Sequence, residues 1–153
     1  MLVLTFRISE VAYGVAVKRV VEVVPRVPLR EIPHAPNYLM GLLRYRGGAV
    51  AVVDLGLLLG GSACRDRLDT RIILVDGGPG SGASFLGLIA ERVENVRTVE
   101  EARRTVAGLE IGRAPYLGAV YETDEGLLQL LEPHKILVGS AVLASDQGEA
   151  VVR

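Results

Sequence analysis

The amino-acid sequence predicts a mainly β protein with about nine or ten short strands and a few short helices. Three observations indicate this fold class. The first residues alternate with a period of two, as expected of a strand with one face buried. Glycine (18 residues) and proline (7 residues) interrupt the apolar runs at short intervals. Half of the 153 residues are hydrophobic, enough for the core of one domain. Strand spacing alone does not choose between one large barrel and two small ones.

In the first half of the chain, segments rich in β-branched and aliphatic residues predict strands. They lie at residues 2–8, 13–17, 20–24 and 49–53. Four prolines, from Pro25 to Pro36, predict an irregular connection after the third strand. Residues 37–43 fit either a short helix or a turn. Asp54 is interpreted as the cap of a short helix over residues 55–59, because its carboxylate can accept bonds from free N–H groups there. A catalytic role for Asp54 is the weaker interpretation.

The second half of the chain continues the β pattern. Strands are expected at residues 71–75, 84–90, 92–99, 117–122 and 127–131. Residues 65–70 alternate in charge and predict a solvated loop, whereas the glycine-rich residues 77–82 predict a flexible hairpin connection. Residues 100–104 and 133–138 are expected to form helical turns, the second with proline in its first turn. Residues 140–153 are expected to be a frayed C-terminal tail.

Composition and charge exclude several classes of function. The formal net charge is −1 and no basic cluster forms, so neither nucleic acid nor an anionic membrane is an expected partner. The N-terminus lacks the pattern of a signal peptide. The most apolar window, residues 49–59, is too short to insert into a bilayer. The expected location is therefore the cytoplasm.

No constellation of residues predicts a catalytic, cofactor-binding or metal site. The single cysteine, Cys64, has no base partner in the sequence and cannot form an internal disulfide. His34 and His134 lie far apart, and neither has a ligand at metal-binding spacing. A small enzyme or ligand-binding barrel would need a polar pocket that brings Glu22, Asp54 and His34 together. The protein is therefore expected to be non-enzymatic.

The block from Ile32 to Leu55 is the most informative part of the chain. It reads I-P-H-A-P-N-Y-L-M-G-L-L-R-Y-R-G-G-A-V-A-V-V-D-L. This order of residues places the charged residue Arg46 on a tight turn between two apolar elements. A charge held there by its backbone is well placed to meet a partner.

This block resembles the signature of the CheW family, the adaptor proteins of bacterial and archaeal chemosensory arrays. The matching residues are Pro33, Pro36, Gly41, Arg46, Gly47, Asp54 and Leu55. Three further segments are similar to family motifs and follow in the family's order. They are F-R-I-S-E-V-A-Y-G-V-A-V-K-R-V-V-E-V from Phe6, G-L-I-A-E-R-V-E-N-V from Gly87 and Y-L-G-A-V-Y-E-T-D-E-G-L-L-Q-L-L-E-P-H-K-I-L from Tyr116. The resemblance covers about residues 1–139.

The resemblance implies a CheW-like fold of two five-stranded SH3-like β-barrel lobes that share a hydrophobic seam. Residues 1–139 would form this single domain of two intertwined lobes. The implied function is a scaffold that couples chemoreceptors to a CheA-type histidine kinase. One lobe would dock the regulatory domain of the kinase, and the groove between the lobes would receive the cytoplasmic tip of a receptor.

The sequence departs from the family pattern at Arg44, Tyr45, Ala51 and the pair Ala90 and Glu91. These departures leave the expected fold unchanged. They raise an alternative function, an adaptor of a chemosensory pathway that does not control flagella. Surface sensing, pilus control or a second messenger would be the output of such a pathway.

Arg46 is the first candidate for the interaction site, because the resemblance implies that it contacts the receptor tip. Its guanidinium offers a rigid fork of donors for a carboxylate or for carbonyls at a helix end. Alternatively, it hydrogen-bonds its own loop. Gly47 is expected to supply a backbone angle that a β-carbon would resist. Gly41 is expected to permit close packing and to affect partners indirectly.

Three valines and one glutamate complete the predicted interaction site. Val20, Val93 and Val96 match family positions that line the groove, where aliphatic walls would hold an amphipathic helix. The alternative for each valine is a place in the core. Glu22 matches an acidic family position, and it either pairs with a basic residue of a partner or is a solvated strand residue.

Overall fold

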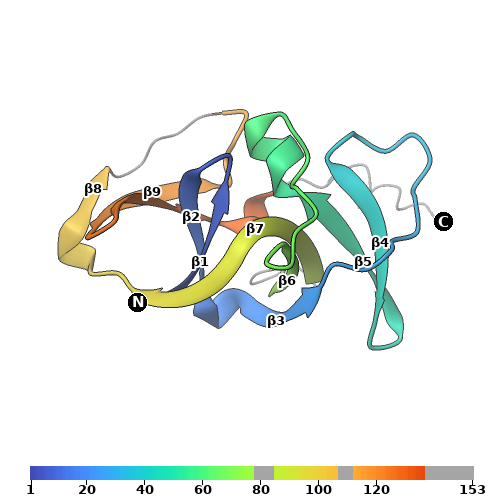
Figure 1. The fold of residues 1–153 in the computed structure, drawn as a ribbon, viewed down its shortest axis with the longest axis horizontal. Helices are drawn as coiled ribbons and strands as arrows, with labels where there is room; N and C mark the ends of the chain where they lie inside the picture. The colour runs from blue at the N-terminus through green and yellow to red at the C-terminus, as the bar shows by residue number, and fades with distance from the viewer. Residues whose placement is uncertain (78–84, 107–111, 137–153) are drawn as a thin grey trace.

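The structure is a computed structural model that describes residues 1–77, 85–106 and 112–136. The chain forms two SH3-like β-barrel lobes that share one long strand, β7 (Phe85–Thr98) (Figure 1). The mainly β fold predicted from the sequence is therefore confirmed. Within the described residues, no helix is both long and apolar enough to cross a bilayer.

The first lobe takes its strands from the middle of the chain. It contains β3 (Val20–Pro25), β4 (Leu39–Tyr45), β5 (Gly48–Asp54), β6 (Arg71–Asp76) and the first half of β7. The strands are hydrogen-bonded in the order β3-β6-β7-β5-β4. β5 and β7 run parallel and the other pairs antiparallel.

The second lobe combines the two ends of the described chain. It contains β1 (Leu2–Ile8), β2 (Val11–Ala16), β9 (Leu117–Thr123), β10 (Gly126–Leu131) and the second half of β7. A short additional strand, β8 (Arg104–Val106), pairs with β9 and was not indicated by the sequence. The order is β7-β1-β2-β10-β9-β8, with β2 and β10 parallel.

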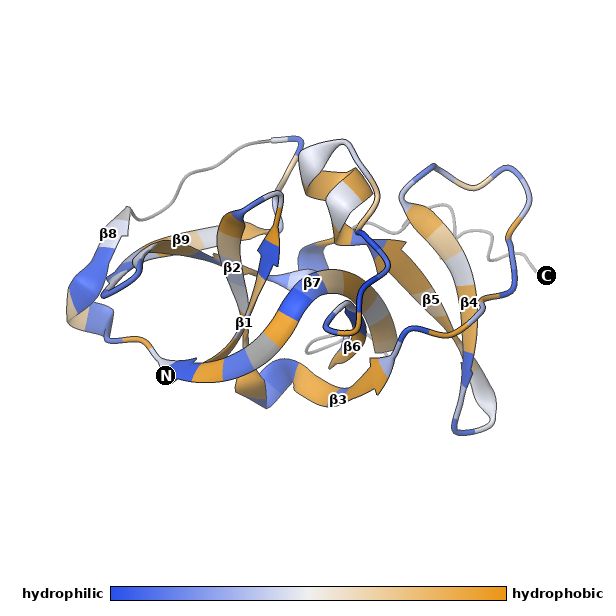
Figure 2. Ribbon diagram, in the orientation of Figure 1, coloured by the Kyte–Doolittle hydropathy of each residue, from blue (hydrophilic) through white to orange (hydrophobic). Residues whose placement is uncertain are grey.

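One hydrophobic core joins the two lobes. It packs Phe6 and Val15 of the second lobe with Val52, Ile73 and Leu88 of the first. β6 is apolar on both faces, and its four central residues are fully buried in this core. β3 and β7 pair with its two edges. Figure 2 shows this apolar character continuing along β3 and β5. A smaller cluster fills the second lobe away from the seam.

Residues 37–43, predicted to be a short helix or a turn, instead belong mostly to the strand β4. The short run L-M-G-L-L does not distinguish helix from strand by itself. Antiparallel pairing with β5 decides the conformation, since Leu43 lies opposite Val50 and Tyr45 opposite Gly48. Burial then alternates along β4, as a strand requires.

The two strands predicted at 84–90 and 92–99 are one continuous strand, β7. Its first half pairs with β6 and its second half with β1. At the crossing point, Glu91 lies opposite Arg7 and Asn95 opposite Thr5, so β7 carries extra residues. Arg92 has a φ of 51°, which marks this bulge and lets the strand bend from one lobe into the other.

The remaining elements are single helical turns. η2 (Gly56–Gly60) follows Asp54, whose Oδ1 accepts a hydrogen bond from the N–H of Leu57 at 3.1 Å, so the predicted cap is confirmed. The same buried carboxylate accepts a bond from the N–H of Cys64 at 3.2 Å. η1 (Val17–Arg19), η3 (Glu101–Arg103) and η4 (Pro133–Lys135) are 3₁₀ turns. Most of the predicted 77–82 connection and the whole 140–153 tail lie outside the described residues.

Candidate functional site

Arg46 and Gly47 form the two-residue turn of the β4–β5 hairpin. Both have positive φ values, 51° and 79°, as the two central residues of a type I′ turn require. A β-carbon on Gly47 would meet nothing within 4 Å, so its glycine is explained by backbone conformation alone, as predicted. The turn therefore fixes the direction in which the Arg46 side chain leaves the lobe.

The Arg46 side chain points outward and is 65% exposed. Its guanidinium carbon lies 4.9 Å from the centroid of the Tyr45 ring, within the range of a cation–π contact. Its Nη2 lies 3.9 Å from Oε1 of Glu22 on β3, longer than a direct hydrogen bond. The exposure agrees with a role in partner binding, which stays a prediction.

Glu22 and Tyr45 come from separate parts of the chain and meet beside Arg46. The Tyr45 hydroxyl donates a short hydrogen bond to Oε1 of Glu22, and this bond raises the pKa of the Tyr45 phenol. The Tyr45 ring also meets Phe85 edge to face, with centroids 6.0 Å apart. We call Glu22, Tyr45, Arg46 and Phe85 the Arg46 surface. Sequence reasoning treated Tyr45 only as a departure from the family pattern and did not single out Phe85.

The three candidate valines do not share one environment. Val96 is 56% exposed on the second half of β7, whereas Val93 is 2% exposed and packs in the main core. The N–H of Val93 bonds to the carbonyl of Asp69, which holds this part of β7 against the first lobe. Val93 is therefore a core residue, which is the alternative that the sequence left open for each of the three valines. Val20 is half-buried on β3.

Val96 has an exposed apolar neighbour that the sequence reasoning missed. In the pairing of β1 with β7, Leu2 lies opposite Thr98 and Leu4 opposite Val96, so Leu2 and Val96 are diagonal neighbours on one face. Leu2 is 53% exposed. The alternation in the sequence of β1 indicated that Leu2 and Leu4 share one face of the strand. It did not indicate that this face is exposed at Leu2, the first residue of the strand. We call Leu2 and Val96 the apolar strip.

Gly41 lies inside β4, where a neighbouring segment approaches closely. Its φ is 144°, and a β-carbon would lie 2.4 Å from the carbonyl oxygen of Arg30. The backbones of Arg30 and Leu42 exchange two hydrogen bonds, at 3.0 and 2.8 Å. The predicted role in close packing is therefore confirmed, although the contact joins a strand to an extended segment rather than a helix to a strand.

Two hollows open on other parts of the surface. The larger, about 610 Å³, lies beside the end of β3 and is lined by Arg26, Leu68 and Arg71 among others. The smaller, about 180 Å³, lies on the second lobe between β1, β7 and the β9–β10 hairpin. Neither is lined by Glu22, Asp54 or His34, the residues that an enzyme-like pocket was expected to bring together. Among residues 1–77, 85–106 and 112–136, no group of three or more His, Cys, Asp or Glu could hold a metal.

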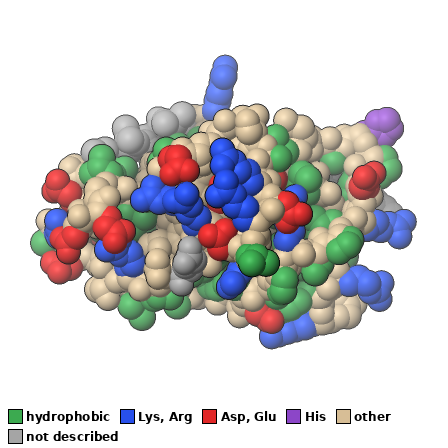
Figure 3. Space-filling view, in the orientation of Figure 1, with side chains coloured by type: hydrophobic (Ala, Val, Ile, Leu, Met, Phe, Trp, Pro, Cys, Tyr) green, Lys and Arg blue, Asp and Glu red, His purple; other side chains and the backbone are tan. Residues whose placement is uncertain are grey.

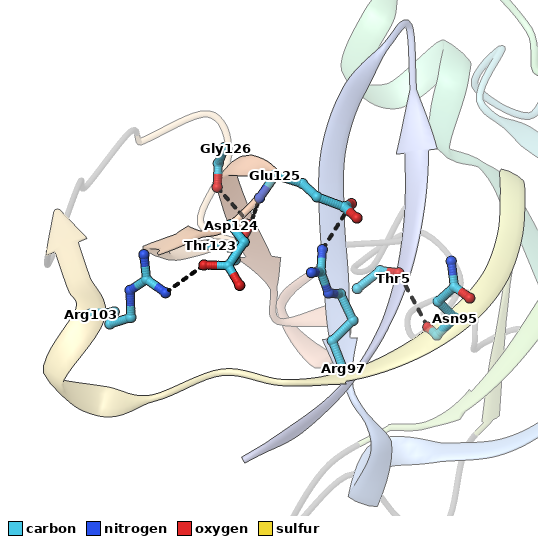
Figure 4. Close-up of polar contacts among 8 residues, drawn as sticks. All are labelled: Thr5, Asn95, Arg97, Arg103, Thr123, Asp124, Glu125 and Gly126. Carbon is cyan, nitrogen blue, oxygen red and sulfur yellow. Dashed lines mark hydrogen bonds and ion pairs between the residues drawn. The ribbon is translucent and has the colours of Figure 1, made fainter.

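Two ion pairs involve the β9–β10 turn, and one of them, Arg97 with Glu125, lines the smaller hollow (Figure 4). Arg97 on β7 pairs with Glu125 at 3.0 Å, and Arg103 pairs with Asp124 at 3.3 Å. Figure 3 shows basic and acidic side chains interspersed over the middle of this face. These pairs link the β9–β10 turn to β7 and η3 at the surface, where an exposed ion pair contributes little stability.

Cys64 is expected to resist alkylation in the folded protein. It is 5% exposed, and burial raises the pKa of its thiol to about 12. At pH 8 only about one thiol in ten thousand would be ionised, and the thiolate is the reactive form. Titration with a thiol reagent should show almost no reaction in buffer and one equivalent in denaturant. Rapid reaction of the folded protein would contradict this result.

Comparison with known proteins places this geometry in a family. A model described as the CheW-like domain matches residues 2–140. The chain is 26% identical over 98 residues to the chemotaxis protein CheW of Rhizobium meliloti (strain 1021), covering 64% of this chain and 61% of that protein. It is 30% identical over 97 residues to protein FrzA of Myxococcus xanthus, covering 63% and 58%. The chain thus spans about three fifths of the length of these curated relatives.

A solved structure has the same fold. The crystal structure of the scaffolding protein TtCheW from Thermoanaerobacter tengcongensis superposes with a TM-score of 0.75 at 24% sequence identity. The match covers 87% of this chain and 84% of that chain. With the family model matched over nearly all of the described residues, this chain belongs to the family of proteins with a CheW-like domain.

Proposed function

We propose that this chain is a non-enzymatic adaptor that couples the cytoplasmic tip of a chemoreceptor to a CheA-type histidine kinase in the cytoplasm. Membership of the CheW-like family supports the adaptor role, as do relatives named chemotaxis protein CheW. The observation that carries the receptor contact is the Arg46 side chain, which is 65% exposed on a conformationally fixed turn.

The receptor tip would bind along the side of the molecule that joins the lobes. In Figure 1, the second half of β7, then β3, then the β4–β5 turn follow one another along the lower edge. This order places the apolar strip at one end and the Arg46 surface at the other. An amphipathic helix suits such a path, because aliphatic side chains would pack on the strip while a carboxylate reaches Arg46.

The kinase would bind one of the two lobes through its regulatory domain, itself a pair of CheW-like barrels by resemblance. Simultaneous binding would hold receptor and kinase in a fixed geometry, so a change in receptor packing would bias kinase activity. Each contact can be modest in such an assembly, because linked modules raise the effective concentration of one another.

An adaptor for a pathway without flagella is the second candidate. The departure at Tyr45 favours it, because the Tyr45 side chain contacts both Arg46 and Glu22. A partner fitted to the common family residues would meet a different surface here. The neighbouring genes discriminate the two: flagellar switch genes support the first pathway, and pilus or diguanylate cyclase genes support the second.

Co-purification tests the adaptor function directly. The full chain would be mixed with the cytoplasmic fragment of a chemoreceptor and with the histidine kinase of the same organism. We expect a complex of all three proteins, with the chain needed for tight association of the other two. If the chain captures neither protein at micromolar concentration, the proposed function is wrong.

Replacing Val96 with aspartate is expected to weaken binding of the receptor fragment by about tenfold, because a charge would be buried under the docked helix. Stability should change little, since this side chain is already 56% exposed. Isothermal titration and thermal unfolding measure the two quantities. Val11→Asp is the matched control, because Val11 is 50% exposed at the start of β2. Equal affinities of the two variants would remove Val96 from the binding surface.

A further inference from the structure

The Tyr45 side chain is held at three points of the Arg46 surface. Its hydroxyl donates to Oε1 of Glu22, its ring lies 4.9 Å from the guanidinium carbon of Arg46, and its ring contacts Phe85 with an interplanar angle of 76°. Glu22 is on β3, Arg46 on the β4–β5 turn and Phe85 on β7. Tyr45 thus connects three elements of the first lobe around one exposed cation.

An arginine on an exposed turn has many rotamers, and fixing one of them on binding costs conformational entropy. The ring of Tyr45 lowers this cost, because a guanidinium over an aromatic ring is attracted by the π electrons and stays there. One face of the guanidinium is then covered. With 65% of the side chain exposed, its N–H groups remain accessible to a partner.

The Tyr45 hydroxyl also limits the internal pairing of Arg46. It occupies Oε1 of Glu22, the same oxygen that lies 3.9 Å from Nη2 of Arg46. A direct charge-assisted hydrogen bond would bring these two atoms to about 2.8 Å. The phenol is therefore the direct donor to this glutamate, whereas the arginine is not, and the guanidinium keeps donors for an external acceptor.

We infer that Tyr45 is a positioning residue that presents the guanidinium of Arg46 edge-on to a carboxylate of the partner. This inference rests on the proposed function, because it assigns the receptor contact to Arg46. It predicts that an acidic side chain of the receptor tip meets Arg46, and that the aromatic ring acts through Arg46 rather than by touching the receptor.

The test combines an NMR signature with a double-mutant cycle. In the free protein, the Nε–Hε resonance of Arg46 should show a ring-current shift that persists in Tyr45→Phe and disappears in Tyr45→Leu. Tyr45→Leu should bind the receptor cytoplasmic fragment about 3- to 10-fold more weakly than the unaltered chain. Tyr45→Phe should show a smaller loss, because Glu22 can then pair with Arg46. Tyr13→Phe, which removes a half-buried hydroxyl from β2, is the control and should change neither readout.

The cycle with Arg46→Ala separates the possible failures. We expect Tyr45→Leu to have no further effect once Arg46 is alanine. If Arg46→Ala binds like the unaltered chain, the proposed receptor contact itself is wrong. If Arg46→Ala weakens binding but Tyr45→Leu does not, only the positioning role is wrong. An equal loss from Tyr45→Leu in both backgrounds, or no ring-current shift in the unaltered chain, would also overturn the inference.

Discussion

Arg46→Glu is expected to weaken binding of the receptor fragment by about 10- to 100-fold, the largest effect on function of any single change considered. The substitution removes the guanidinium and places a second carboxylate near Glu22, whose Oε1 now lies 3.9 Å from Arg46. A partner carboxylate would meet repulsion in place of a donor. Surface plasmon resonance with an immobilised receptor fragment measures the loss.

The fold should tolerate this change. The Arg46 side chain is 65% exposed, and a surface side chain of this kind contributes little to stability. We expect the melting temperature to fall by no more than about 3 °C. Arg67→Glu, an exposed charge reversal on the 65–70 loop, is the matched control and should leave receptor binding unchanged. Unchanged capture by Arg46→Glu would show that the receptor does not contact this turn.

Much of the fold could be predicted because alternation, proline and glycine report directly on strands and turns. β1 and the β9–β10 hairpin follow this local pattern closely. β4 could not be predicted in this way, because its apolar run fits a helix or a strand and only pairing with β5 decides between them. The continuity of β7 could not be predicted either, because the break that the sequence predicted near Arg92 is a bulge inside one strand.

The interaction site could be predicted only in part. Family resemblance indicated Arg46 and Glu22, and the structure brings both to one surface. Resemblance also indicated Val93 and Val96 together. They are three positions apart on β7, close to the bulge at Arg92 where the register with β1 shifts, so alternation along the strand does not decide which side each faces. In the structure Val93 is in the core and Val96 is exposed.

Tyr45 could not be found from local pattern. Its partner Glu22 is 23 positions away, on β3, and β3 is not hydrogen-bonded to β4. Only the packing of the whole first lobe brings the phenol to the carboxylate. The departure from the family pattern at Tyr45 therefore helps to locate the site, because Tyr45 contacts Glu22 and Arg46, two residues that match the pattern.

Gly41→Ala is expected to lower the free energy of unfolding by about 3 kcal/mol and the melting temperature by about 10 °C. The new β-carbon would lie 2.4 Å from the carbonyl oxygen of Arg30 and 3.0 Å from its carbonyl carbon, both backbone atoms. A φ of 144° is also unfavourable for alanine. Chemical denaturation followed by circular dichroism measures the loss.

Gly47→Ala is the matched control, because it isolates backbone strain from steric overlap. Its φ of 79° is also unfavourable, but a β-carbon there would meet nothing within 4 Å. It should cost about 1 kcal/mol, the penalty for a left-handed residue alone. If both alanine variants lost the same free energy of unfolding, the segment at Arg30 would move aside without cost. Close packing would then not explain why position 41 is glycine.

The cost of Gly41→Ala should extend to partner binding. The pairing of β4 with β5 shifts register between Leu39 and Gly41, and that register sets which residues reach the turn. Separating Arg30 from Leu42 would break two backbone hydrogen bonds and release this end of β4. We therefore expect the folded fraction of the variant to bind the receptor fragment more weakly. This effect would be indirect, because Gly41 is buried and precedes Arg46 by several residues along β4. Full affinity in the folded fraction would show that the turn keeps its position without the Arg30 contact.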